Sequence, residues 1–531
     1  MNRTALLERL KNETFDLLVI GGGASGAGVA LDAATRGLKV ALVERLDFSE
    51  GTSSRSTKLI HGGVRYLEIA VKTLDRVQLN LVRDALHERS MLLKLAPHLT
   101  RPLWLLTPLY KLWEMPYYWT GLKLYDLLAG NARLQVSRYL GPQETLRRFP
   151  RVRSEGLVGA VAYQDGQFDD ARYNLEVILT ALEEGAVAVN YTEVTGLLKK
   201  NGKIAGAVVQ DRLGGQEFEV GARVVVNATG PFSDSIRHLD DPAAPELVKA
   251  SSGVHIVLGP TYSPPDTGLL IPHTEDGRVI FVLPWLGQTL VGTTDDPAEP
   301  TPHPRASEEE IAYILRQVEP YLGKVAREEV RAAWAGFRPL VAKPQAADTA
   351  RLARDHLVQE SASGLLTLTG GKWTTYRKMA LDCVNYAVRK FGLQAGPSRT
   401  HERLLVGGWG FDPNGAQKLA QEYSLEPDIA QHLHRSYGSR AGQVAEIGQT
   451  FRLAPGYPYI ESEVVYAARH ELAQTPMDVL ARRTRLAFLD TKAAEAALPE
   501  VAKLMAKELG WKAEERKAQE NQTQERLAVA I

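Results

Sequence analysis

The chain has 531 residues, of which 63 are Lys or Arg and 63 are Asp or Glu, so its formal charge is zero. A balanced charge gives no support for nucleic-acid binding through a global basic field, so we expect no nucleic-acid partner. A chain of this length predicts about three domains. The one cysteine, Cys383, cannot form an intramolecular disulfide and has no metal-ligand spacing around it, so we expect a reducing compartment and no metal. Its apolar, helix-like surroundings predict a small core residue.

Residues 1–16 are polar with scattered leucines, which predicts a short amphipathic helix and no secretory signal. An apolar run at 15–20 is followed by small residues with helical character at 24–36 and by a second apolar run at 39–44. Strand–helix–strand within about 30 residues predicts a βαβ unit and therefore a parallel sheet. Hairpin patterns at 203–220 and 279–293 predict additional antiparallel strands.

These elements predict an α/β fold with three domains. A Rossmann-type nucleotide-binding domain is interrupted by an antiparallel-sheet substrate domain and followed by an all-helical domain. The last 20 residues are polar, which predicts a frayed terminus. The expected boundaries are 1–72, 152–235 and 340–395 for the first domain, 73–151 and 236–339 for the second, and 396–531 for the third.

A glycine-rich turn joins the first predicted strand to the first predicted helix. Gly21, Gly23 and Gly26 match the pattern G-x-G-x-x-G. The first glycine allows the tight turn, the second lets a pyrophosphate approach the backbone, and the third lets helix and strand pack closely. Glu44 ends the next strand, where we expect it to bind the ribose hydroxyls of a dinucleotide. Its carboxylate disfavours a 2′-phosphate, so NADP is not expected.

The glycine motif alone does not distinguish FAD from NAD. Residues 50–63 (EGTSSRSTKLIHGG) follow the second strand and are rich in small hydrogen-bond donors, as the long pyrophosphate–ribityl chain of a flavin requires. A second glycine turn, at 370–372, precedes another helix, whose N-terminus could stabilise negative charge on a reduced flavin. Two such turns at opposite ends of the chain favour FAD.

Several motifs occur in one order along the chain: GGGASGAG, TSSRSTKLIHGGVRYLE, VVNATGPFSD, LPWLG with VGTTD, GFRPLV, and GGKWTTYRKMA. On these motifs the chain resembles the FAD-dependent glycerol-3-phosphate dehydrogenases, from Phe15 to beyond Asp490. The stretch YIESEVVYAARHELAQTPMDVLARRTRLAFLD resembles the helical cap domain of that family. Oxidases of the same substrate carry an additional insert, for which we find no room between Arg338 and Gly370.

The resemblance implies oxidation of sn-glycerol 3-phosphate to dihydroxyacetone phosphate, with a hydride passing from C2 to N5 of FAD and electrons passing to a membrane quinone. It also implies which residues bind the cofactor. The expected cofactor residues are Gly21, Gly23, Ala24, Ser25, Gly26, Glu44, Thr52, Ser53, Ser54, Lys58, Leu59, His61, Gly62, Gly63, Val194, Ala228, Thr229, Gly230, Gly371, Lys372 and Thr374.

The substrate is a phosphate dianion beside a secondary alcohol, so its site needs cations and a group that accepts the C2 hydroxyl proton. The resemblance implies that His255, Arg338 and Lys372 are catalytic. His255 is the chemically simplest base because its ordinary pKa lies near working pH, whereas Arg338 or Lys372 could stabilise the developing alkoxide. The expected substrate-binding residues are Arg65, Tyr66, His255, Arg338 and Arg354.

An aromatic-rich stretch at 104–128 contains charged residues and prolines, so we do not expect it to span a bilayer. It predicts either substrate-domain core or contact with one leaflet. We expect a cytoplasmic enzyme attached peripherally to the inner face of the cytoplasmic membrane, with Arg482, Arg483 and Arg485 as candidate contacts to anionic lipid. Two other functions stay open: an amino-acid or sarcosine-type oxidase that uses oxygen, and a flavin-binding sensor without catalysis. A homodimer is one of the assemblies that the sequence leaves open.

Overall fold

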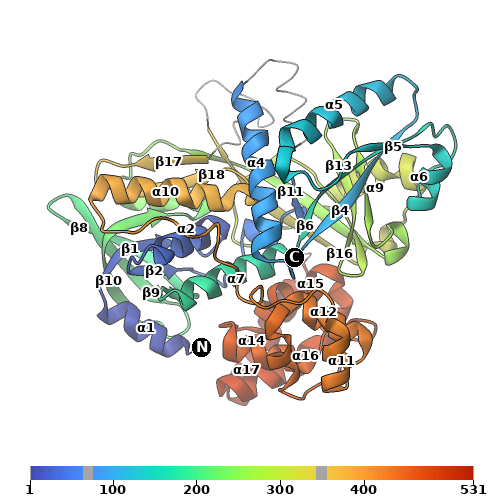
Figure 1. Cartoon of the computed structure of the whole chain (residues 1–531). Coiled ribbons are helices and arrows are strands. Elements are labelled where there is room, and N and C mark those ends of the chain that lie inside the picture. The colour runs from blue at the N-terminus through green and yellow to red at the C-terminus, as the bar shows by residue number, and fades with distance from the viewer. Residues whose placement is uncertain (1, 64–75, 343–355, 530–531) are drawn as a thin grey trace.

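The computed structural model describes residues 2–63, 76–342 and 356–529, which form two sheet domains and a helical C-terminal domain (Figure 1). The first sheet has the order β17-β18-β10-β1-β2-β7, and these six strands run parallel except β17, while β9 joins the sheet by antiparallel pairing with β10 and β8 by antiparallel pairing with β9. Ile20 pairs with Val43 on one side and Asn227 on the other, so the turns that follow these strands meet at one edge. The strands are β1 (Phe15–Ile20), β2 (Val40–Val43), β7 (Val187–Val189), β10 (Glu217–Asn227), β17 (His356–Glu360) and β18 (Leu366–Gly370).

Both faces of this sheet are covered, as expected for buried parallel strands. One face packs against α2 (Ala24–Thr35), α7 (Asp170–Glu183) and α10 (Tyr376–Phe391). The other packs against α1 (Arg3–Asn12) and the ribbon of β8 (Thr192–Lys200) and β9 (Lys203–Asp211). A Cβ added at Gly26 would lie 1.9 Å from the Gly21 carbonyl oxygen, which confirms the predicted close packing of helix on strand. Cys383, on α10, is fully buried in the core, as predicted.

The second sheet is mostly antiparallel and has the order β15-β11-β14-β13-β12-β4-β6-β3, with β16 beside β11 and β5 beside β6. Because β6 pairs with β4 along its whole length, the first domain resumes near Asp170 and not at residue 152. The strands are β3 (Leu59–Ile60), β4 (Thr100–Leu109), β5 (Arg138–Leu140), β6 (Gly159–Phe168), β11 (Val248–Leu258), β12 (Thr267–Ile271), β13 (Ile280–Trp285), β14 (Gln288–Gly292), β15 (Asp296–Pro297) and β16 (Ala332–Val341).

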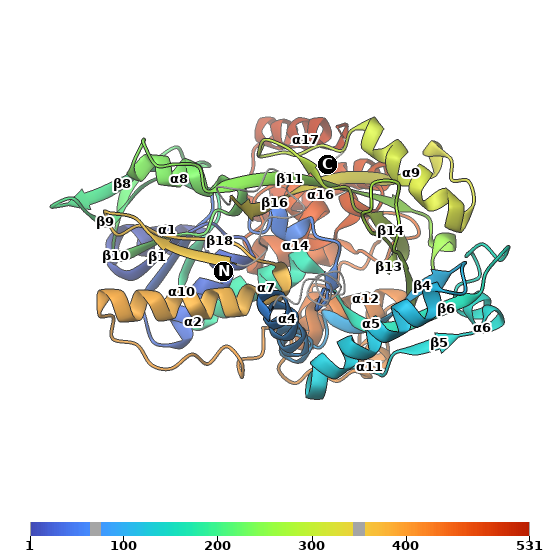
Figure 2. The ribbon, with the colours of Figure 1, turned by 90° about the horizontal axis from the view of Figure 1, so that it is seen from above.

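The view from above places the two sheet domains side by side (Figure 2). The remaining α-helices of the two sheet domains are α4 (Arg76–Leu95), α5 (Glu114–Ala129), α6 (Pro142–Arg148), α8 (Ser233–Asp240) and α9 (Glu308–Leu322).

The C-terminal domain is helical, as predicted, and lies against both sheet domains (Figure 1). The expectation of a frayed terminus is wrong. Residues 513–527 form a helix, because Thr523 and Leu527 are buried and Arg526 pairs with Glu50 of the first domain. The helices are α11 (Gly415–Tyr423), α12 (Pro427–Tyr437), α13 (Ala441–Ala445), α14 (Glu461–His470), α15 (Leu486–Leu489), α16 (Thr491–Leu509) and α17 (Ala513–Leu527).

Candidate active site

A cavity of about 710 Å³ lies where the two sheet domains meet. The first domain contributes the turns after β1, β10 and β18 and the loop after β2, and the second contributes residues of β11, β13 and β16. Residues far apart in sequence therefore meet in one place. The predicted residues that line the cavity are Gly21, Gly23, Ala24, Ser25, Glu44, Thr52, Ser53, Leu59, His61, Gly63, Val194, Ala228, Thr229, Gly230, His255, Arg338, Gly371, Lys372 and Thr374.

Four predicted cofactor residues do not line the cavity. Gly26 is the packing glycine of α2, and the Gly62 backbone N–H donates to the Tyr125 hydroxyl. The Ser54 carbonyl accepts a hydrogen bond from Lys58 Nζ beneath the loop. Lys58 is completely buried, so its assignment as a cofactor ligand is corrected to a cation that supports the loop from below. Arg65, Tyr66 and Arg354 lie outside the described residues.

The dinucleotide part of the cavity is built from backbone turns. Gly21 has a φ of 112°, and a Cβ there would lie 2.7 Å from the Ala228 carbonyl oxygen, so only glycine fits. Ser53 Oγ accepts a hydrogen bond from the Ala24 N–H at 2.8 Å, which joins the donor-rich loop to the start of α2. A Cβ at Gly23 would lie only 3.0 Å from Ser53 Oγ, so glycine leaves the backbone of this turn accessible from the cavity.

Glu44 is held in place by the backbone around it. Its Oε2 accepts from the Gly22 N–H at 2.7 Å and its Oε1 accepts from the Leu46 N–H at 3.0 Å. Burial raises the pKa of Glu44 above its ordinary value, and these two hydrogen bonds oppose that rise. The carboxylate thus lines the cavity in a fixed orientation, as a ribose ligand requires.

His255 lies on β11 with its ring stacked on Trp334, at 4.3 Å between ring centroids. Its Nε2 is 3.0 Å from Thr57 Oγ1. Burial, with repulsion from the nearby cations Lys58 and Arg338, lowers the pKa of His255 well below 6.5. The ring is therefore neutral at neutral pH and able to accept a proton. Sequence reasoning missed Thr57, although it lies inside the donor-rich motif that was singled out.

Arg338 lines the cavity from β16 and is anchored by acceptors of the protein. Its Nη1 donates to Asp295 Oδ1 at 3.0 Å, and its Nη2 donates to the Thr294 carbonyl at 3.1 Å and to Thr293 Oγ1 at 3.2 Å. Asp295 was missed as a site residue, although it ends the VGTTD motif. The guanidinium is thereby fixed next to the cavity.

Lys372 lies at the second glycine turn, as predicted, directly after Gly371 with its φ of 72°. The next residue, Trp373, was missed. Its Nε1 donates to the Ser53 carbonyl at 2.9 Å, so the turn after β18 is tied to the loop after β2. These contacts bring the two glycine turns, from opposite ends of the sequence, into one site.

The cavity extends beneath α5 into a chamber with mainly apolar walls. Its lining includes Leu105, Tyr163, Leu270 and Phe281. The polar groups there include Tyr118 of α5, whose hydroxyl is 2.8 Å from His273 Nε2.

The outer surface of α5 and its preceding turn is also apolar. Leu112 is 79% exposed and Trp113 is 61% exposed. The stretch at 104–128 contributes to the substrate-domain core through β4, as one of the two alternatives predicted, and α5 also carries exposed apolar side chains; contact with a leaflet stays a prediction. Across the described parts of the chain, no helix combines the length and apolar character that crossing a membrane requires.

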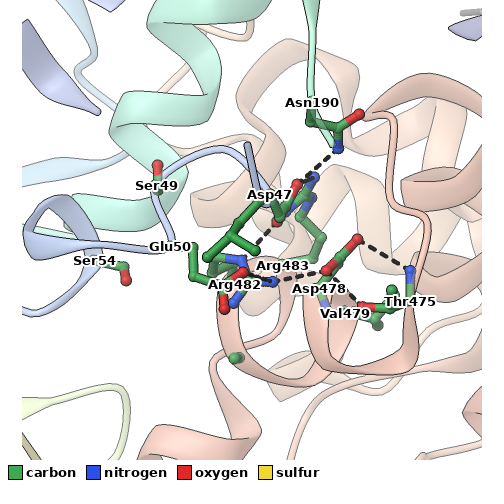
Figure 3. A network of polar contacts seen from close by, with 12 residues as sticks. Asp47, Ser49, Glu50, Ser54, Asn190, Thr475, Asp478, Val479, Arg482 and Arg483 are labelled. Carbon is green, nitrogen blue, oxygen red and sulfur yellow. Dashed lines mark hydrogen bonds and ion pairs between the residues drawn. The ribbon is translucent and has the colours of Figure 1, made fainter. Parts of the chain in front are cut away.

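The arginines predicted to contact lipid are buried. Arg482, Arg483 and Arg485 lie between the C-terminal domain and the first domain, where the first two pair with Asp47 (Figure 3). A side chain enclosed by protein cannot bind a lipid headgroup, so that prediction is wrong.

Two protein families match this chain, one over the sheet domains and one over the C-terminal domain. A family described as FAD dependent oxidoreductase matches residues 16–377, and one described as C-terminal domain of alpha-glycerophosphate oxidase matches residues 398–516. A human protein named mitochondrial glycerol-3-phosphate dehydrogenase is 52% identical over 96% of this chain and 73% of its own. An Arabidopsis thaliana protein named mitochondrial glycerol-3-phosphate dehydrogenase SDP6 is 47% identical over 96% of this chain and 85% of its own.

Solved structures agree with these relatives. Glycerol-3-phosphate dehydrogenase from Bacillus halodurans, complexed with FAD, superposes with a TM-score of 0.81 at 30% identity and covers 99% of this chain and 97% of its own. L-alpha-glycerophosphate oxidase from Mycoplasma pneumoniae covers 73% of this chain and 97% of its own, with a TM-score of 0.56. At 18% identity this second likeness concerns the fold alone.

Proposed function

Because this chain belongs to the FAD-dependent oxidoreductases, we propose that it oxidises sn-glycerol 3-phosphate to dihydroxyacetone phosphate with FAD as its cofactor. One observation of the site carries the proposal: a buried, neutral His255 shares the cavity with the cations Arg338 and Lys372. A proton acceptor beside cations is the combination that an alcohol next to a phosphate requires. The relatives named glycerol-3-phosphate dehydrogenase support the same substrate.

The chain's own residues then have distinct tasks. Gly23, Ser53 and Glu44 hold the dinucleotide, and bound FAD supplies the two-electron acceptor for the C2 hydride. The C2 hydroxyl proton passes through the hydroxyl of the cavity-lining Thr57, which gives its own proton to His255 Nε2 at 3.0 Å and takes the substrate proton in its place. A depressed pKa leaves this nitrogen unprotonated before the reaction. Arg338 stabilises the negative charge that the lost proton leaves on the oxygen.

We further propose that the electrons leave to a quinone dissolved in a membrane, to which the enzyme attaches peripherally through α5. Tyr118 of α5 lines the cavity, and the turn before this helix presents Leu112 and Trp113 to the surroundings. Exposed aromatic and aliphatic side chains of this kind favour an interfacial position. An apolar electron acceptor could thus pass from the bilayer into the chamber beneath α5.

The substrate is tested by anaerobic addition of glycerol 3-phosphate to the holoenzyme while the flavin absorption band is followed. We expect the band to bleach with glycerol 3-phosphate and to persist with sarcosine or glycine. His255→Gln should keep its flavin and bleach at least about 100-fold more slowly, since a general base contributes about that much. Bleaching by sarcosine would identify an amino-acid oxidase, and no bleaching by any substrate would favour a sensor. Either result would reject the proposed reaction.

The acceptor and the membrane are tested separately. We expect rapid turnover with a soluble quinone analogue and slow peroxide formation in air; rapid stoichiometric peroxide production would exclude the dehydrogenase assignment. Trp113→Ser should weaken flotation with phospholipid vesicles while leaving turnover with the soluble acceptor unchanged. The matched control is Phe451→Ser, because Phe451 is 77% exposed and belongs to the C-terminal domain, in the segment between α13 and α14. Equal loss of flotation in both variants would remove α5 as the docking surface.

A further inference from the structure

A buried layer of charged residues joins the C-terminal domain to the loop after β2. Residues 478–485 (DVLARRTR) contain a π-helical turn, and Arg485 has a φ of 67°. A left-handed conformation is uncommon for a residue other than glycine, and π-turns are frequent at functional sites. The segment therefore has an unusual backbone at the point where it faces the first domain.

The arginines of this segment contact two different parts of the first domain. Arg482 Nε and Arg483 Nη1 lie 2.6 Å and 2.5 Å from Asp47 Oδ2, and Arg482 Nη2 also lies 3.3 Å from Glu50 Oε2 (Figure 3). Arg485 instead donates from Nη2 to the Ser54 carbonyl at 2.7 Å and to Asp170 Oδ1 at 3.2 Å.

Asp170 binds several groups of the loop that contains Thr57. Its Oδ2 accepts from the Ser56 N–H at 2.9 Å and from the Ser56 hydroxyl at 2.8 Å. Lys58 Nζ lies 2.8 Å from the same oxygen and also donates to the Ser54 carbonyl. The loop is thus fixed on both sides of Thr57, whose hydroxyl lies 3.0 Å from His255 Nε2.

A second contact of the C-terminal domain reaches the same histidine. The ring of Phe488, on α15, packs edge-on against Trp334 at 5.3 Å between centroids. Trp334 stacks on the other side of the arrangement against His255 at 4.3 Å. The Arg485 guanidinium lies 4.5 Å from the centroid of the Phe488 ring, so the contact to the loop and the contact to Trp334 come from residues that lie close together in the C-terminal domain.

We propose that Arg485 is a positioning residue of the active site, holding Ser56 and Thr57 through Asp170 so that the Thr57 hydroxyl meets His255. The C-terminal domain thereby contributes to the geometry of the active site. The inference rests on the proposed function, in which His255 takes the substrate proton. A lysine at 485 has one ammonium group, so it cannot donate to Ser54 and Asp170 as Nη2 does while also donating to the Ala481 carbonyl as Nη1 does.

The test is a double-mutant cycle on the holoenzyme, with Arg485→Lys, Thr57→Val and the double variant. Each single change should lower kcat about 10-fold, with the KM for glycerol 3-phosphate changed less than about 2-fold. Because Arg485 acts through Thr57, the double variant should also lose only about 10-fold. The matched control is Arg483→Lys, which alters a buried arginine of the same segment. It should lower the thermal midpoint and keep kcat within about 2-fold, since Arg482 also binds Asp47.

Two outcomes would overturn the proposal. A loss of about 100-fold in the double variant would mean that the two residues act independently. Equal losses of kcat in Arg483→Lys and Arg485→Lys would mean that only general domain packing matters. The flavin absorption spectrum gives a readout apart from turnover, because Arg485→Lys and Thr57→Val should shift it in the same way and Arg483→Lys should not. If the wild type reduces no flavin with glycerol 3-phosphate, the proposed function fails, while these spectra still decide whether Arg485 positions the loop.

Discussion

Arg338→Ala is the perturbation whose effect the structure specifies most closely. Both Nη atoms of Arg338 already donate to the protein, at 3.0 Å to Asp295 and 3.1 Å to the Thr294 carbonyl. The substrate therefore meets a fixed cation. A charge-assisted hydrogen bond contributes about 1.5–3 kcal/mol. The alanine variant loses that interaction and also leaves the Asp295 carboxylate without this cation, close to a substrate dianion. We expect a loss of about 3 kcal/mol, or roughly 100-fold in kcat/KM.

The assay measures kcat/KM for glycerol 3-phosphate with a soluble acceptor, together with flavin content. Arg338→Lys should recover activity only partly, because an ammonium cannot make the two-pronged contact. The double variant Arg338→Ala/Asp295→Ala separates the two contributions. It should regain about 10-fold relative to Arg338→Ala, because the carboxylate that repels the substrate dianion is gone. Near-normal kcat/KM in Arg338→Ala would refute the reasoning, and loss of flavin would place Arg338 in the cofactor site.

Three further predictions concern charge. Glu44→Arg should abolish flavin retention on dialysis, because a cation cannot accept hydrogen bonds from the ribose; full occupancy would remove Glu44 from the ribose site. The lowered pKa of His255 predicts that kcat/KM decreases at acid pH with an apparent pKa below 6.5. An apparent pKa at or above 6.5 would contradict this prediction. Burial raises the pKa of Glu50, but attraction from Arg482 and Arg526 outweighs it and lowers the pKa to about 2. Glu50 therefore stabilises the fold fully above its ordinary pKa of 4.5, and this stability is lost as the pH falls from 4.5 toward 2. Thermal midpoints of wild type and Glu50→Gln should converge over that range, and a constant difference would count against it.

The sequence was sufficient for the local features of the site because their causes are local. The glycine spacing and the flanking apolar runs predict the βαβ unit, and Glu44 follows directly from the end of the second strand. His255 and Arg338 were named through the family resemblance, and both line the cavity. The residues missed, Thr57, Asp295 and Trp373, lay within motifs already singled out, but a motif does not state which of its side chains faces which partner.

Two buried basic residues were misassigned. The family resemblance implied that Lys58 binds the cofactor, and residue type suggested that Arg485 contacts lipid, because basic side chains are usually exposed or bound to anions. Both are enclosed around Asp170, which lies more than a hundred residues away from Lys58 and more than three hundred from Arg485. Partners so distant in sequence leave no periodic or spacing signal.

The sequence by itself determined the fold class, the order of the domains, the cofactor motif and the family. Hydrophobic periodicity and glycine positions act over a few residues, so one strand or turn is enough to express them. Only the tertiary structure decided that Thr57 meets His255, that Asp295 anchors Arg338, and that the C-terminal domain supports the loop beneath the active site. Those contacts depend on how two sheets and a helical domain pack together, and burial, not residue type, determines which charges become partners.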